Sequence, residues 1–176
     1  YAALCQQAKM VPIVEPEVLM DGSHDIDRCF DVTSEVLKEV FAELNNQKVA
    51  LNGIVLKPNM VISGMDAENR ADIPTVASAT VKCLSENVPD EVPGIAFLSG
   101  GQTSEEATGH LNAMNEMGPH PWQLTFSYGR ALQAEPLNSW SGEDENIPAA
   151  QESFIKRSRL NSLARTGNYH PQMEEA

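Results

Sequence analysis

The sequence predicts an α/β fold of four strand–helix units, which make half of a TIM-type (β/α)8 barrel. Short apolar runs begin near residues 11, 53, 94 and 123, and most are followed by segments with helical spacing. This alternation favours parallel strands joined by right-handed crossovers. Polar residues follow each apolar run, as at the active-site face of a barrel. The chain has 176 residues, and a whole barrel needs about 250. An open, doubly wound four-strand sheet is the structural alternative.

The elements follow in order along the chain. Residues 1–9 predict the end of a helix, and VPIVEPEV over 11–18 predicts the first strand. Apolar residues at helical spacing over 25–45 predict a helix. GIVLKPN over 53–59 predicts the second strand, and 73–87 the next helix.

The second half repeats this pattern. GIAFL over 94–98 predicts the third strand, and acidic residues open a helix over 104–117, where they suit the helix dipole. QLTFS over 123–127 predicts the fourth strand, which is followed by a short helix towards Trp140. A polar loop separates that helix from a last helix over 146–164.

Residues 1–165 form the predicted barrel half and residues 166–176 a C-terminal tail. We expect the tail to be mobile from Asn168 onward. A short basic run in the last helix predicts a solvated helix face; it comprises Lys156, Arg157 and Arg159.

Composition narrows the function classes. The net charge of −13 disfavours nucleic acid as a partner, because phosphates require basic surface. No apolar run has the 18 residues or so expected of a membrane span. The chain starts without Met and without a secretory signal, so we expect it to begin inside a longer protein. Three scattered cysteines are no disulfide framework, which fits a reducing intracellular compartment.

The sequence predicts no metal site. The four residues Asp21, His24, Asp25 and Asp27 could be imagined as ligands. They surround the turn-forming pair Asp21-Gly22, however, so a surface loop and a helix cap explain them better. No cofactor is predicted.

Two acids end the first predicted strand. Glu15 and Glu17 are two residues apart, so they point to the same side as Val11 and Ile13. Acids are costly in a closed core but suit a barrel mouth with water and polar partners. Solvated loop acids are the alternative. A glycosidase carboxylate pair is another, since the two would lie roughly 6.6 Å apart along the strand.

Lys57 ends the second predicted strand. Pro58 keeps the preceding residue extended, so Lys57 shares its face with Val55. It is either a snorkelling surface lysine or a partly desolvated amine that can attack a carbonyl.

The last two predicted strands end in motifs that are suited to binding phosphate. Ser99, Gly100 and Gly101 follow the third strand. Glycines allow close backbone approach, and exposed N–H groups suit an oxyanion. Ser127-Tyr128-Gly129-Arg130 follows the fourth strand, where Arg130 offers a charged fork. Because barrel phosphate sites often use the loops after strands seven and eight, the four strands are predicted to be five to eight.

These motifs resemble class I fructose-bisphosphate aldolase, in family order from about residue 1 to 165. The matching stretches are LCQQ at 4–7, VPIVEPEV at 11–18, LKPNM at 56–60, FLSGG at 97–101 and FSYGRALQ at 126–133.

The resemblance implies a metal-free glycolytic and gluconeogenic lyase, cytoplasmic or plastid, and usually a homotetramer. It implies cleavage of fructose 1,6-bisphosphate to dihydroxyacetone phosphate and glyceraldehyde 3-phosphate. Lys57 would be the Schiff-base lysine and Glu15 the acid/base group, with Glu17 beside it. Ser99, Gly100, Gly101, Ser127, Gly129 and Arg130 would contact substrate and phosphate.

The resemblance is incomplete at both ends. The family's first half, with a catalytic aspartate, further lysines and an arginine, is absent, and so is its frequent C-terminal tyrosine. Tyr169 does not replace that tyrosine. We therefore expect the 176-residue chain to be inactive by itself. A non-catalytic sugar-phosphate-binding or assembly fragment is the alternative function.

Overall fold

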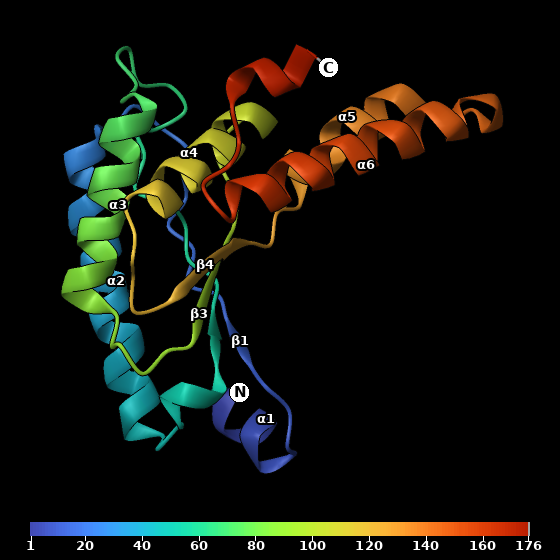
Figure 1. Ribbon diagram of the computed structural model, residues 1–176. Coiled ribbons are helices and arrows are strands. Elements are labelled where there is room, and N and C mark those ends of the chain that lie inside the picture. Colours follow the sequence, from blue (N-terminus) through green and yellow to red (C-terminus); the bar gives the residue numbers. More distant parts are fainter. Residues whose placement is uncertain (176) are drawn as a thin grey trace.

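Four short parallel strands form the centre of the molecule, a computed structural model that describes residues 1–175 (Figure 1). They pair in the order β1-β2-β3-β4. The strands are β1 (Ile13–Val14), β2 (Val55–Leu56), β3 (Gly94–Phe97) and β4 (Gln123–Phe126). The helices are α1 (Ala2–Gln7), α2 (Ile26–Asn46), α3 (Ile73–Asn87), α4 (Ser104–Glu116), α5 (Arg130–Trp140) and α6 (Ile147–Ala164). Three 3-10 turns are η1 (Leu51–Gly53), η2 (Asp144–Asn146) and η3 (Pro171–Glu175).

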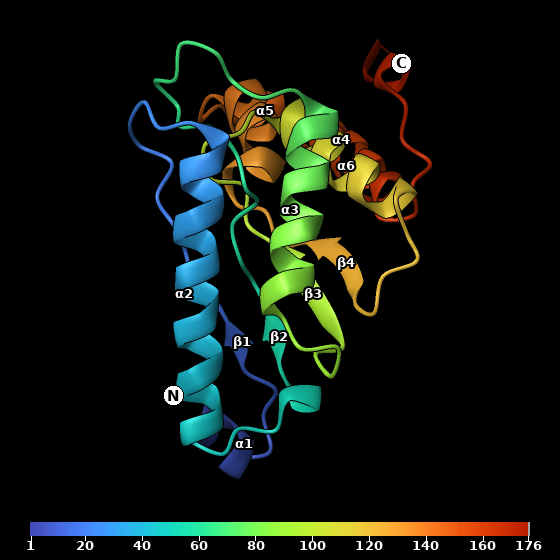
Figure 2. The same ribbon diagram turned by 90° about the vertical axis from the view of Figure 1, so that its left-hand side faces the viewer.

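Helices α2 and α3 cover one face of the sheet. Helices α2 and α3 run side by side along it (Figure 2). The side chains of Leu56, Ile95 and Phe97 point to this side and are fully buried. On the other face, Val11 and Ile13 remain 66% and 53% exposed. This open face is the side that would line the interior of a closed barrel.

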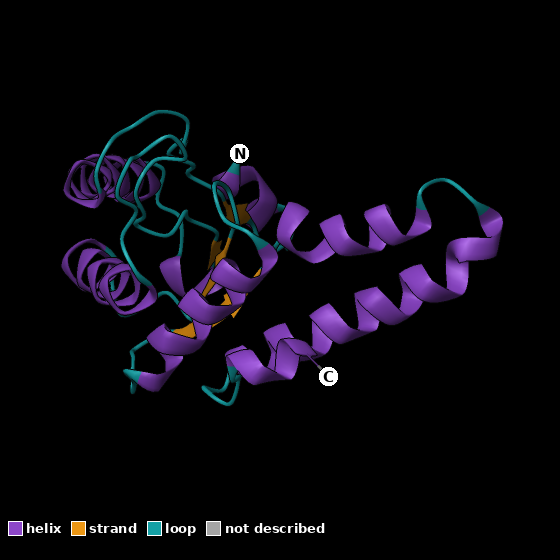
Figure 3. Cartoon of the chain, turned by 90° about the horizontal axis from the view of Figure 1, so that it is seen from above, coloured by secondary structure: helices purple, strands orange, loops and turns teal. Residues whose placement is uncertain are grey.

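Helices α5 and α6 form an antiparallel hairpin that projects away from the sheet (Figure 3). Among the described residues, no helix combines the length and the apolar composition needed to cross a membrane.

Strand register decides which strand-end side chains meet. Ile13 lies opposite Val55 and Val14 opposite Leu56, which places Glu15 opposite Lys57 one step further. The strands are shorter than predicted, although the pairing continues beyond them: the N–H of Lys57 donates to Val14 O at 2.7 Å. Prolines 12, 16 and 58 supply no N–H, which interrupts the ladders. Gly53, predicted to open the second strand, lies in η1 instead.

Side-chain caps fix where the long helices begin. Asp25 accepts the N–H of Arg28 at 2.8 Å and caps α2, which confirms its predicted capping role. Thr103 and Glu106 form a capping box at the start of α4.

The C-terminal region differs from the sequence prediction. Tyr169, in the tail expected to be mobile, is buried, and its N–H donates to Asn112 Oδ1 at 2.9 Å. Arg157, expected on a solvated helix face, is only 1% exposed. Its guanidinium bonds both Glu174 oxygens, at 2.8 and 2.9 Å, and Glu135 at 2.7 Å. The prediction failed because these partners lie about 20 residues away along the chain, where helix periodicity gives no information about them.

Candidate active site

Lys57 and Glu15 meet at the carboxyl ends of β2 and β1. Lys57 Nζ lies 2.9 Å from Glu15 Oε1. The lysine side chain is 20% exposed and the glutamate side chain 45%, so the pair sits at an open but partly desolvated mouth. The contact follows from the register of the two strands, since parallel neighbours at one level project to the same side. An amine next to a carboxylate can exchange a proton with it directly.

Glu17 lies beyond the end of β1 and beside the third strand-end loop. Its Oε1 would be 3.4 Å from a Cβ atom built on Gly100. The segment that carries it is held by Asn59, whose Oδ1 accepts the N–H of Val18 at 3.1 Å. Asn59 is itself buried and donates to Thr33 Oγ1 at 3.0 Å. The two acids therefore have separate surroundings, Glu15 at Lys57 and Glu17 at Gly100.

The Ser99–Gly101 turn follows β3 and is tightly packed. Gly101 has φ +75°, and a Cβ there would lie 2.6 Å from Met20 Cβ. Only glycine fits this combination of backbone angle and space. The N–H of Gln102 closes the turn by donating to Ser99 O at 3.2 Å. Within residues 1–175, the N–H groups of Gly100 and Gly101 have no protein acceptor.

The fourth strand end joins this turn to the start of α5. Buried Ser99 accepts the N–H of Ala131 on its Oγ at 3.4 Å, next to Arg130. Arg130 is exposed at the first position of α5 and has no ion-pair partner in the described part of the chain. Gly129 caps the helix, and Ser127 is half-buried.

Tyr128 has a packing role. Its hydroxyl donates to Ala107 O at 2.8 Å. Burial raises the pKa of Tyr128 far above its ordinary value, so it stays protonated.

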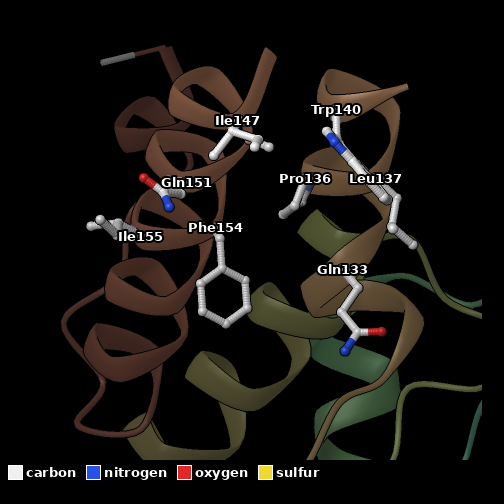
Figure 4. Close-up of a pocket in the computed structure, with 9 residues that line it drawn as sticks. Gln133, Pro136, Leu137, Trp140, Ile147, Gln151, Phe154 and Ile155 are labelled. Carbon is white, nitrogen blue, oxygen red and sulfur yellow. The ribbon is translucent and has the colours of Figure 1, made fainter. Parts of the chain in front are cut away.

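The structure offers neither a metal site nor a second catalytic pocket in its described part. Over residues 1–175, no group of three or more His, Cys, Asp or Glu side chains is placed to hold a metal ion. A hollow of about 680 Å³ lies between α5 and α6, with Pro136, Leu137 and Phe154 around it (Figure 4). Apart from two glutamines its lining is apolar, and none of the predicted site residues lines it. It contains no group suited to acid–base chemistry.

The family model for class-I fructose-bisphosphate aldolase, described as glycolytic, matches residues 1–176. The chain belongs to the class-I fructose-bisphosphate aldolase family. This confirms the resemblance inferred from the VPIVEPEV, LKPNM and SYGRALQ motifs.

Relatives within the aldolase family are strongly similar. The chain is 56% identical over 170 residues to fructose-bisphosphate aldolase B of Gallus gallus, covering 96% of this chain and 47% of that protein. It is 53% identical over 169 residues to fructose-bisphosphate aldolase 1 of Toxoplasma gondii, with 96% and 47% covered. The chain thus spans about half the length of these curated relatives.

A solved aldolase confirms the fold. The Plasmodium falciparum enzyme, crystallised with TRAP and a small-molecule inhibitor, is 50% identical and superimposes with a TM-score of 0.93. The match covers 97% of this chain and 49% of that one. The four parallel strands and their helices are therefore the predicted C-terminal half of a TIM-type barrel, not an independent open sheet.

Two residues that the sequence analysis did not single out help to build the site. Asn59 fixes the segment next to Glu17, and Arg70 bonds the backbone of Gly101 at 2.8 Å. Asn59 lies in the resembling LKPNM stretch, so its polar side chain in an otherwise apolar run was a usable signal. No local pattern marks Arg70, because its partners follow the next strand.

Proposed function

We propose that this chain carries the Schiff-base half of a fructose 1,6-bisphosphate aldolase, with Lys57 as the nucleophile and Glu15 as its proton-transfer partner. The observation that carries this proposal is the 2.9 Å contact between Lys57 Nζ and Glu15 Oε1 at the open mouth of the sheet. Imine formation needs a neutral amine next to a group that can take up and return protons.

The proposed reaction begins with a proton passing from Lys57 to Glu15. The neutral amine attacks the ketone carbon of the sugar, and the oxygen becomes the hydroxyl of a carbinolamine. Glu15 returns a proton to this hydroxyl, which leaves as water and gives an iminium ion. A carboxylate base at the mouth then takes the proton of the hydroxyl on the carbon to be released; the electrons of the C–C bond pass to the iminium, and an aldehyde leaves with an enamine on Lys57. Protonation of the resulting enamine and hydrolysis release the ketone product and restore Lys57.

The phosphate groups would bind at the next two strand ends. The N–H groups of Gly100 and Gly101 have no acceptor within residues 1–175. Arg130 begins α5, and the next residue, Ala131, donates its N–H to Ser99 Oγ at 3.4 Å, which brings this helix start to the turn. Backbone N–H groups and a guanidinium are strong donors for phosphate oxygens. The substrate would thus lie across the mouth, from Lys57 to the Ser99–Gly101 turn, where Glu17 lines its path.

A carboxylate-pair glycosidase gains no support from this geometry. Glu15 and Glu17 both lie past the regular part of β1, and each has its own neighbour. In the whole enzyme, missing groups would come from the other half of the barrel; the homotetramer and a cytoplasmic or plastid location belong to the same proposal.

Borohydride trapping tests the proposal. The whole enzyme is treated with borohydride and dihydroxyacetone phosphate, digested, and analysed by mass spectrometry. The reduced adduct is expected on Lys57, with loss of turnover in proportion to its amount. The exposed Lys82 is the internal control, since it should stay unmodified.

Three results would argue against the proposal. An adduct on Lys9, Lys48, Lys82 or Lys156 would show that another lysine is the nucleophile. Turnover without any adduct would exclude a Schiff base. A folded whole protein that binds sugar phosphate but never cleaves it would favour the non-catalytic binding function.

A further inference from the structure

Arg70 connects the loop after β2 with the turn after β3. Its Nη2 donates to Gly101 O at 2.8 Å, and its Nη1 donates to Glu106 Oε1 at 3.2 Å. The other oxygen of Glu106 accepts the N–H of Thr103 at 2.9 Å as part of the α4 capping box. One guanidinium therefore joins the end of the glycine turn to the start of the helix that follows it.

The backbone that carries Arg70 is itself fixed. The N–H of Ala71 donates at 3.1 Å to Oγ of the buried Ser63. One residue further, Asp72 caps α3 by accepting the N–H of Thr75 at 3.0 Å. Arg70 thus extends from a rigid base, and an anchored fork loses less entropy when it forms its two hydrogen bonds.

The carbonyl end of the glycine turn is held by the Arg70 hydrogen bond in addition to close packing. Met20 and Ile62 pack against Gly101 from one side, with φ at +75°. The Arg70 bond holds the Gly101 carbonyl, and the Gln102 N–H closes the turn onto Ser99. Together these contacts fix the peptide group between Gly101 and Gln102, which follows directly on the Gly100 and Gly101 N–H groups and restricts the directions they can take.

We propose that Arg70 is a positioning residue for phosphate binding, which acts by holding the Ser99–Gly101 turn and not by contacting the substrate. This inference rests on the proposed function, because it requires the turn to bind a phosphate. Backbone N–H groups bind an oxyanion well only when they already point to a common centre. Without Arg70, the turn must be ordered by the ligand itself, which weakens binding.

The test uses the whole enzyme and three variants: Arg70→Ala, Arg70→Lys and, as a matched loss of surface charge, Lys82→Ala. Inorganic phosphate serves as a competitive inhibitor, and fructose 1,6-bisphosphate as the substrate. Dihydroxyacetone with borohydride reports imine formation that needs no phosphate contact. Arg70→Ala should raise the phosphate inhibition constant and the KM for the bisphosphate about tenfold. Dihydroxyacetone trapping on Lys57 should change less than about twofold, because the Lys57–Glu15 pair is untouched.

The lysine variant separates positioning from charge. A lysine keeps the charge, but its single ammonium is a poor substitute for the fork that joins Gly101 O to Glu106. It should recover only part of the loss, and Lys82→Ala should match the unmodified enzyme. Arg70→Lys also decides the question by itself if Arg70→Ala does not fold.

Several outcomes would overturn the inference. Unchanged phosphate inhibition in the folded Arg70 variants would show that the turn needs no anchor. Equal losses for phosphate and dihydroxyacetone would show a general structural defect, and full recovery with lysine would show that only charge matters. A failure of the proposed function is distinguishable, because it would appear in the unmodified enzyme as missing turnover or a missing Lys57 adduct.

Discussion

Lys57 and Arg157 are both cations paired with glutamates, yet their surroundings are opposite. Lys57 is 20% exposed and faces one carboxylate across the open mouth of the sheet. Arg157 is 1% exposed and lies near three, Glu105, Glu135 and Glu174. Burial lowers the pKa of Arg157, but the hydrogen bonds that it donates to Glu174 and Glu135 outweigh this and raise it. Its charge therefore stays in place.

The difference separates the ion pair of the proposed site from a structural one. A single, partly exposed pair costs little to break, so in the proposed function the Lys57 side chain is available to a substrate. A buried arginine that satisfies several carboxylates cannot leave without exposing them to each other. The Arg157 cluster thus joins α5, α6 and the C-terminal turn η3, whereas the mouth stays available for chemistry.

The largest expected effect is at the mouth. Lys57→Met in the whole enzyme should lower kcat/KM by about 10⁴-fold or more, because no imine can form. Stability should change by only about 1 kcal/mol, since a single, partly exposed ion pair contributes little. Turnover assays and urea unfolding measure the two effects. Lys82→Met is the matched control and should retain activity. Near-normal turnover of the Lys57→Met enzyme would show that Lys57 is not the nucleophile.

Replacing the buried Arg157 should mainly affect the stability of the fold. Arg157→Met should destabilise the fold by about 3–5 kcal/mol, because Glu135 and Glu174 lose their shared counter-ion. Urea unfolding gives the size of the loss. Adding Glu174→Gln should recover part of it by removing one uncompensated charge. If Arg157→Met is as stable as the unmodified enzyme, the cluster is not a structural joint.

The buried, neutral His110 should make the stability of the fold depend on pH. Burial lowers the pKa of His110 to about 4, with Glu106 opposing the shift and Arg70 adding to it. The unfolded chain takes up this proton near pH 6.5, but the folded chain does so only near pH 4. The free energy of unfolding should therefore fall by about 3 kcal/mol as pH decreases across that window.

His110→Gln isolates this contribution. In urea unfolding measured from pH 7 to pH 4, its stability should decline less steeply than that of the unmodified enzyme. The exposed His170 provides the control, since His170→Gln should keep the full decline. Identical slopes in all three would mean that His110 accepts its proton while folded.

The smallest expected effect is at Arg130. Arg130→Ala should weaken phosphate binding by about 1.5–3 kcal/mol, the range of a charged hydrogen bond. Its stability should barely change because Arg130 is exposed and unpaired among residues 1–175. Inhibition by inorganic phosphate measures the first effect and thermal unfolding the second. Binding of a non-phosphorylated ketone should be weakened much less. Equal losses for both ligands would show that Arg130 does not bind the phosphate group.

Much of the fold was predictable because it depends on short-range patterns. Apolar runs and helical spacing gave the order of strands and helices, and Asp25 was a recognisable cap. The proximity of Glu15 and Lys57 was also predictable, since both end parallel strands on the same side. Strand ends were less predictable: the prolines around β1 and β2 broke the ladders earlier than the apolar runs suggested.

The sequence by itself determined the family, the parallel four-strand order and the set of polar residues at the strand ends. Only the tertiary structure decided which charged side chains are buried in ion pairs that hold the fold together. Arg130 and Arg157 are the same residue type on two adjacent helices, one exposed and one buried. Their roles differ because Glu135 and Glu174 reach Arg157 from α5 and from the C-terminal turn. Such partners are brought together by packing and not by spacing along one helix.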